Sequence, residues 1–209
     1  SGAAVAMLAV VAFNYWQAPQ VLNNLDLQTV AVIEENNEDL AAEVQLSGTF
    51  SFVEGNVQNK KGTEWIDVEV GEIISTNDLI QTLSDSKSII TFDDGSILRL
   101  DENTYIEIQE ANNENIIVKQ VSGQTYSRVN KSHIFEYKIR SLDTIVTAMG
   151  TAFTINRNHG DDVILKVLES KVKVEKEGEL DSENKEEIGE MKILEEIVAG
   201  ESFVYNAST

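Results

Sequence analysis

The chain has 209 residues, of which 42% are hydrophobic, enough to fill a core and to exclude disorder throughout. Its 36 Asp and Glu against 16 Lys and Arg give a formal net charge of -20, so no nucleic-acid partner is expected. The absence of cysteine excludes disulfide bonds, thiolate zinc sites and a thiol nucleophile.

Residues 1–17 are predicted to form an apolar helix. Small and apolar side chains run without a break over residues 2–13 and lead into two aromatic residues typical of a membrane interface. Spanning a bilayer takes ~20 apolar residues, so two interpretations stay open: a remnant of a membrane anchor, or a helix buried between copies in a polymer. The side chains that would contact the membrane or polymer core are Val5, Leu8, Val11, Phe13, Tyr15 and Trp16.

Residues 18–43 are predicted to form a polar connector. The segment is acidic around short apolar islands, and Pro19 interrupts regular structure near its start. Acidic residues after the predicted helix favour the outer side of a membrane under the positive-inside rule. We therefore expect the remainder of the chain to be extracytoplasmic, in the periplasm or at the cell surface.

Residues 44–209 are predicted to form an all-β domain, because apolar and polar side chains alternate with period two. The alternation is clear in Phe135, Tyr137 and Ile139, and again in Val172 and Val174. Similar short strands are predicted at Ile89 to Phe92, Ile97 to Leu100, Tyr105 to Ile108, Ile116 to Val121, Thr144 to Ala148, Phe153 to Asn156, Val163 to Leu168 and Ser202 to Tyr205.

Two turn sequences predict hairpins in this domain. Residues 93–96, Asp-Asp-Gly-Ser, separate two predicted strands, and residues 158–161, Asn-His-Gly-Asp, separate another two. By contrast, residues 175–190 hold almost no β-branched or aromatic side chains. This acidic stretch is predicted to be a solvated excursion between two strands.

The order of several motifs resembles the FecR domain family. The similarity covers roughly residues 48–205, and two positions depart from the family pattern: Ser170 replaces the usual glycine, and Ala148 stands where proline is common. The matching segments are Val70 to Glu72, Asp78 to Thr82, Phe92 to Leu100, Thr104 to Ile108, Val121 to Tyr126, Thr147 to Phe153, Val167 to Val174 and Ala199 to Glu201. Within these segments the structural motif residues are Gly71, Asp94, Gly95, Ser96, Leu100, Gly123, Gly150, Thr151, Phe153 and Gly200.

This resemblance implies a solenoid-like or sandwich-like β-domain outside the cytoplasm. The family is best known from regulators of iron-uptake sigma factors, in which the domain lies between a membrane helix and a segment that binds a receptor signal. The resemblance therefore implies cell-envelope signalling through protein partners. The motif residues are structural in kind, since glycines permit turns and Phe153 and Leu100 suit core positions.

No enzyme activity and no cofactor are expected. His133 follows Ser132 without a well-placed acidic partner, and no Gly-x-Ser-x-Gly sequence is present. Carboxylates of the two hairpins raise the possibility of calcium, which prefers oxygen ligands. Their spacing matches no known calcium loop, and turn chemistry explains the same residues without metal. These calcium candidates are Asp93, Asp94, Asp161 and Asp162.

Two functions from different classes fit the sequence. The first is a non-enzymatic extracytoplasmic binding or scaffolding module, tethered by the predicted N-terminal helix, whose edge strands accept a segment of a protein partner. The alternative is a structural subunit of a cell-surface filament or envelope assembly, in which residues 2–16 are buried between copies and self-association is the function.

Overall fold

The computed structural model describes residues 48–112, 114–131, 136–158, 162–177, 179–180, 187–188 and 192–207. The predicted apolar helix and the polar connector, residues 1–17 and 18–43, lie outside these ranges. Within them every regular element is a strand, which confirms the all-β class. No helix long and apolar enough to cross a membrane occurs in the described part of the chain.

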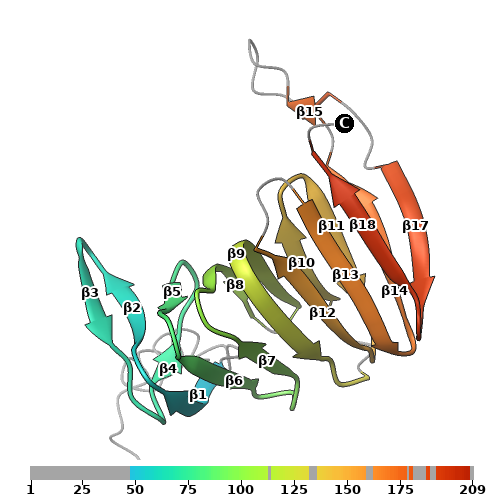
Figure 1. Ribbon diagram of the computed structural model, residues 1–209. Coiled ribbons are helices and arrows are strands. Elements are labelled where there is room, and N and C mark those ends of the chain that lie inside the picture. The colour runs from blue at the N-terminus through green and yellow to red at the C-terminus, as the bar shows by residue number, and fades with distance from the viewer. Residues whose placement is uncertain are drawn as a thin grey trace, which may run out of the picture. The chain divides into compact units, whose positions relative to one another are not determined.

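Sixteen strands join into one hydrogen-bonded sheet that folds into two layers, A and B (Figure 1). Layer A holds β1 (Gly48–Glu54), β4 (Ile73–Ile74), β6 (Lys87–Phe92), β7 (Ile97–Leu100), β12 (Ala152–Arg157), β13 (Asp162–Glu169) and β18 (Ser202–Asn206). Layer B holds β2 (Val57–Lys61), β3 (Glu64–Asp67), β5 (Leu79–Thr82), β8 (Tyr105–Ala111), β10 (Glu136–Ser141), β11 (Thr144–Ala148), β14 (Lys171–Lys176) and β17 (Lys192–Val198). The long strand β9 (Asn115–Arg128) belongs to both layers, while β15 (Glu179–Leu180) and β16 (Glu187–Ile188) form a separate pair.

The strand order places four strands at the ends of the two layers. Layer A runs β4-β1-β6-β7-β9-β12-β13-β18, and layer B runs β3-β2-β5-β8-β9-β10-β11-β14-β17. Among the described pairs only β9 and β10 run parallel. The outermost strands are therefore β4 and β18 in layer A, and β3 and β17 in layer B.

The core lies between the layers and is centred on Tyr137 of β10. Its ring meets Phe92 and Phe153 of layer A edge to face, with centroids 6.2 and 6.4 Å away. Its hydroxyl lies 3.0 Å from the Ser127 hydroxyl, also in layer A. Burial raises the pKa of Tyr137 well above its usual value, so the phenol stays neutral and the hydrogen bond is kept. These contacts bind the layers face to face.

Where β9 passes from layer B to layer A, a fully buried glutamine holds the corner. The amide nitrogen of Gln120 donates to the carbonyl oxygens of Gly123 and Ile155 at 2.9 and 3.2 Å. Its side-chain oxygen accepts a hydrogen bond of 2.8 Å from the Thr125 hydroxyl. The buried amide of Gln120 thus supplies donors to the backbone carbonyls of Gly123 and Ile155 at the bend.

The backbone at Gly123 completes the corner. Its φ is +90°, and a Cβ built there would overlap the Cα, Cβ and Oγ1 atoms of Thr104. Thr104 needs this approach, because its hydroxyl accepts from the Gln124 N–H at 3.0 Å and its own N–H donates to Thr82. Only glycine satisfies both the conformation and the space.

The strands predicted from period-two alternation coincide with β6–β14 and β18, and both hairpins are antiparallel pairs, β6–β7 and β12–β13. Several features differ from the prediction: β1–β5 and β17 were not predicted individually, and the pair β15–β16 lies within the predicted 175–190 excursion. The segments 116–121 and 121–126 form one strand, β9, and β14 extends to Lys176, so the first two residues of the predicted 175–190 excursion are in a strand. Glu175 is buried there, because Lys173 pairs with its carboxylate at 2.7 Å.

We expect Gly123→Ala to lower the free energy of unfolding far more than Gly200→Ala. Both glycines have nearly the same positive φ, +90° and +91°, but nothing lies within 4 Å of a Cβ at Gly200. The control should lose ~1 kcal/mol from backbone strain alone, whereas the overlap with Thr104 should bring the loss at Gly123 to ~3 kcal/mol or more. Urea unfolding of both variants measures the difference, and equal losses would contradict the tight corner.

Candidate functional site

The edge of β18 is the best candidate for a binding site on the described residues. Five residues of β18 pair with β13 in a regular antiparallel register, from Ser202 opposite Lys166 to Asn206 opposite Asp162. No other described strand pairs with the second edge of β18. An antiparallel ladder uses about half of a strand's backbone groups, so the remaining N–H and C=O groups face outward.

The side chains of β18 suit the addition of another strand. Phe203 and Tyr205 point inward and pack against the core, whereas Val204 points outward and is 61% exposed. The strand Ser-Phe-Val-Tyr-Asn contains no charged residue and no proline. Natural sheet edges are usually protected by such residues or by a bulge. This edge carries none of these protections.

The three other outermost strands are less suited to pairing. In layer B, β17 carries Lys192, Glu195 and Glu196, and its register with β14 shifts between Val174 and Glu175. At the opposite end, β4 has two residues, and β3 has four with a carboxylate at each end. Charge, bulge and shortness are the usual protections of an edge, so β18 stands apart from these three strands.

A hydrogen bond between the layers holds β18 in place. The Tyr205 hydroxyl donates to the Asp143 carboxylate at 2.6 Å, and Lys176 pairs with the same carboxylate at 3.5 Å. Burial, and then the hydrogen bond to Asp143, raise the pKa of Tyr205. Because the phenol keeps its proton, it can donate this hydrogen bond, which connects β18 at the edge of layer A to the β10–β11 turn of layer B.

The predicted structural motif residues do not form one site. Leu100 and Phe153 are fully buried in the core, Gly123 lies at the β9 corner, and Thr151 donates its hydroxyl to the Lys171 carbonyl at 2.8 Å. Gly150 has φ +71° and lies against Lys131. The remaining motif glycines, Gly71, Gly95 and Gly200, have positive φ in turns. Gly95, Gly150 and Thr151 line one shallow hollow, and the other motif residues are dispersed along both layers.

The calcium candidates occupy ordinary turn and strand positions where they are described. Both carboxylate oxygens of Asp94 accept hydrogen bonds from Ser96, from its N–H at 2.8 Å and its hydroxyl at 2.5 Å. Ser96 is buried, and its hydroxyl also accepts from the Asn130 N–H. Asp162 accepts from the Asn206 amide, and Asp161 lies outside the described residues. Within the described ranges no three acidic or histidine side chains group as metal ligands.

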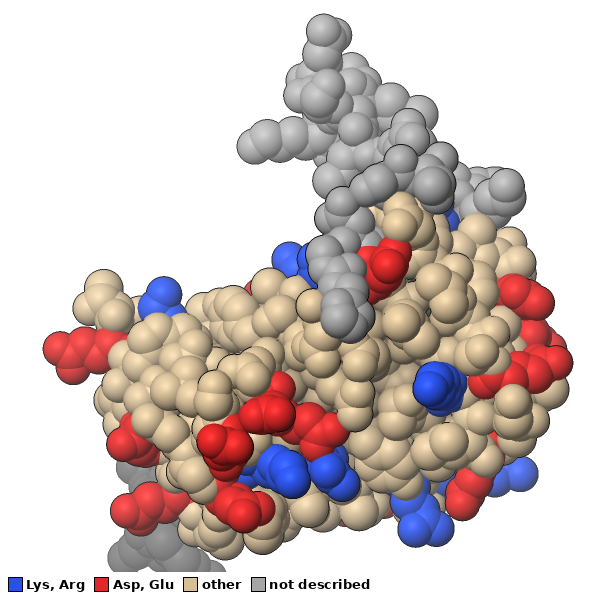
Figure 2. Space-filling model, viewed as in Figure 1, with Lys and Arg blue, Asp and Glu red and all other residues tan. Residues whose placement is uncertain are grey.

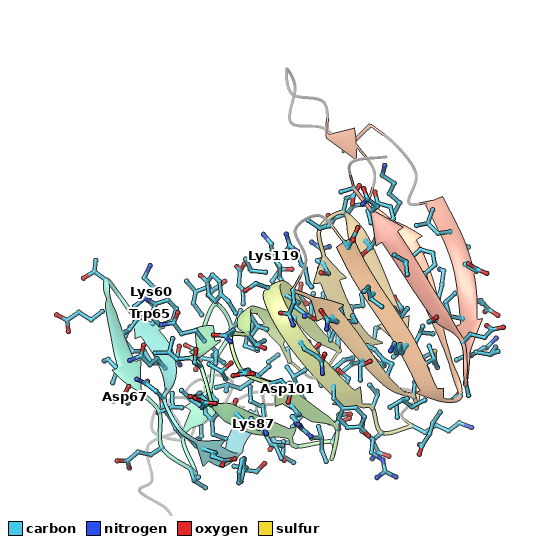
Figure 3. The ribbon with its side chains drawn as sticks, in the orientation of Figure 1. Lys60, Trp65, Asp67, Lys87, Asp101 and Lys119 are labelled. Carbon is cyan, nitrogen blue, oxygen red and sulfur yellow. The ribbon has the colours of Figure 1, made fainter. Side chains whose placement is uncertain are left out.

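A shallow hollow of about 300 Å³ on the outer face of layer A was not predicted from the sequence. Arg99 pairs with Asp101 at 2.6 Å, and Gln124 donates to the same carboxylate at 2.8 Å. Figure 3 shows Lys87 and Asp101 on this part of the sheet, and Figure 2 shows basic and acidic side chains mixed on the viewed face. Three of its polar side chains, Arg99, Asp101 and Gln124, thus bind one another, and the lining mixes cations with carboxylates, so this surface favours no charged ligand.

Residues 78–173 match the family model described as FecR protein. Two crystal structures of a "putative anti-sigma factor" from Parabacteroides distasonis ATCC 8503 are similar, each with 15% identity, a TM-score of 0.48, and coverage of 61% of this chain and 54% of that chain. This chain thus spans about half the length of those solved chains. No curated protein matches.

We expect calcium to stabilise the protein no more than sodium chloride of equal ionic strength. Salt should raise the melting temperature by screening the net charge of -20, with a Debye length of ~10 Å at 0.1 M. Both carboxylate oxygens of Asp94 already accept hydrogen bonds from Ser96, and no three acidic side chains of the described residues group around it, so calcium should add nothing specific. A calcium-specific rise in melting temperature that Asp93→Ala or Asp161→Ala abolishes would instead establish a metal site.

Proposed function

Because residues 78–173 match the FecR family model, we propose that this protein is an extracytoplasmic module of cell-envelope signalling whose protein partner adds a strand to β18. The family supports the signalling role, and the open edge of β18 supports the mode of binding. The predicted apolar segment, residues 1–17, would tether the module to the membrane.

The observation that carries this proposal is the unprotected edge itself. Backbone groups of a sheet edge bind an extended peptide without regard to its side chains, and side chains on alternate positions then give specificity. Five residues of β18 offer a strand of ~17 Å at about 3.3 Å per residue. Because Tyr205 fixes this strand to Asp143, little ordering of β18 would oppose the binding.

The side chains of β18 indicate what the added strand should contain. Its inward residues would continue the row of Phe203 and Tyr205 at the end of the core, so apolar side chains are favoured there. Its outward residue would lie beside Val204, where a β-branched side chain suits a half-exposed sheet face. The partner segment is thus an extended sequence in which apolar residues alternate with small or polar ones.

We expect Val204→Lys to abolish binding of extended peptides while leaving the domain folded. Lysine on an edge strand opposes further pairing, and the Val204 side chain is 61% exposed, so the domain itself should tolerate the change. The probe is an array of immobilised peptides of about seven residues with alternating apolar and polar positions. Wild-type protein should bind a subset of them at least about tenfold more tightly than Val204→Lys does.

Val198→Lys on β17 is the matched control, because Val198 is an exposed valine, at 45%, on the outermost strand of the other layer. The control should bind the same peptides as the wild type. If Val204→Lys still binds the peptides, or if Val198→Lys loses binding to the same extent, β18 is not the docking edge.

A photo-crosslinker at position 204 of the full chain, expressed in its own cells, should then label an extended segment of one partner. Crosslinks only to other copies of this chain would favour the assembly alternative instead.

A further inference from the structure

The outer face of layer B, at the end formed by β3, β2, β5 and β8, carries a second group of side chains that strand pairing at β18 does not use. The registers align these outward residues in two rows across the strands. One row contains Trp65, Lys60, Leu79, Glu107 and Lys119, and the other contains Asp67, Gln58, Gln81 and Tyr105.

Two aromatic rings cover this face. The centroids of Trp65 and Tyr105 lie 6.0 Å apart with an interplanar angle of 73°. Two strands, β2 and β5, separate β3 from β8, so the two side chains must lean toward each other over the sheet. The Lys60 ammonium lies 5.9 Å from the Trp65 centroid, and Figure 3 shows both residues on the β2–β3 hairpin. At that distance an exposed ammonium adds little, so a ligand could displace it.

Beside the rings runs a ladder of hydrogen-bonded polar side chains. The Gln81 amide donates to the Gln58 side-chain oxygen at 2.9 Å, and the Gln58 amide donates to Asp67 at 2.9 Å. A primary amide has two N–H groups and a carboxylate accepts several hydrogen bonds, so each member can still bind a hydroxyl group. The ladder holds these groups in fixed positions next to the aromatic surface.

The two rows are balanced in charge although the whole chain has a net charge of -20. Lys60 and Lys119 oppose Asp67 and Glu107 within the rows, and Glu110 lies beyond them on β8. The rows themselves attract neither polyanions nor polycations at long range, which favours an uncharged ligand rich in hydroxyl groups.

We propose that this face binds a neutral, β-linked hexopyranose chain, with a sugar ring stacked on Trp65, the Tyr105 ring beside it, and its hydroxyl groups bonded to the Gln81, Gln58 and Asp67 ladder. A hexopyranose with equatorial hydroxyls presents an apolar C–H face that matches an aromatic surface and a polar rim that matches amides and carboxylates. β-linkage keeps successive rings extended, as a flat sheet face requires. The site is independent of β18 and would let the module contact an envelope polysaccharide while it binds a protein.

The test uses cellohexaose as the probe and maltohexaose, its α-linked counterpart, as the ligand control. The chain has two tryptophans, Trp16 and Trp65, so a Trp16→Phe background makes Trp65 the only indole reporter. Cellohexaose should change the Trp65 emission in a saturable manner, and maltohexaose should do so at least about tenfold more weakly.

Calorimetry on the full chain then locates the site. Trp65→Ala should weaken cellohexaose binding at least about tenfold, and Trp65→Phe should restore part of it, since the smaller ring still offers an apolar face. Tyr126→Ala is the matched control, because Tyr126 lies on layer A and should leave binding unchanged. Absent binding of cellohexaose, equal binding of maltohexaose, or equal affinity of Trp65→Ala would each overturn the proposal, and none of these results bears on peptide binding at β18.

Discussion

The hydrogen bonds of Gln120 at the corner of β9 are the constraint on which both layers depend. Four strands pair with β9: β8 and β10 on its first half in layer B, and β7 and β12 on its second half in layer A. The corner amide of Gln120 bonds to Gly123 in the same strand and to Ile155 in β12, and so joins the bend to the neighbouring strand. A buried network of this kind stabilises one geometry only when all its members are satisfied.

Much of the strand pattern could be predicted from the sequence, because alternation and turn chemistry are local. Ile97–Leu100 and Thr144–Ala148 were predicted with the bounds that the structure gives. The strands before Ile89 were not predicted individually, since β2 reads Val-Gln-Asn-Lys-Lys and its buried Asn59 interrupts the apolar pattern. That β9 is one continuous strand was also not predicted, because its bend depends on contacts with other strands: Gln120 donates to the Ile155 carbonyl, and the Thr104 hydroxyl donates to the Gln124 carbonyl.

The candidate surfaces were harder to predict than the fold. The β18 segment was predicted as a strand, but its position at the end of layer A follows from pairing with β13, about 40 residues earlier in the chain. Likewise, Trp65 and Tyr105 are distant in sequence, and only the order β3-β2-β5-β8 brings their rings together. A strand's neighbours, unlike its alternation, are set by long-range contacts, so open edges and shared faces emerge only from the three-dimensional arrangement.

The two layers should unfold as one cooperative unit joined at Gln120. Native-state hydrogen exchange along β9 tests this most directly. The amides of Val118 in layer B and of Ser127 in layer A should exchange with the same opening free energy, equal to the free energy of global unfolding measured with denaturant. An opening free energy for one half of β9 that is clearly lower than for the other would contradict the account, because one layer would then open while its partner stays folded.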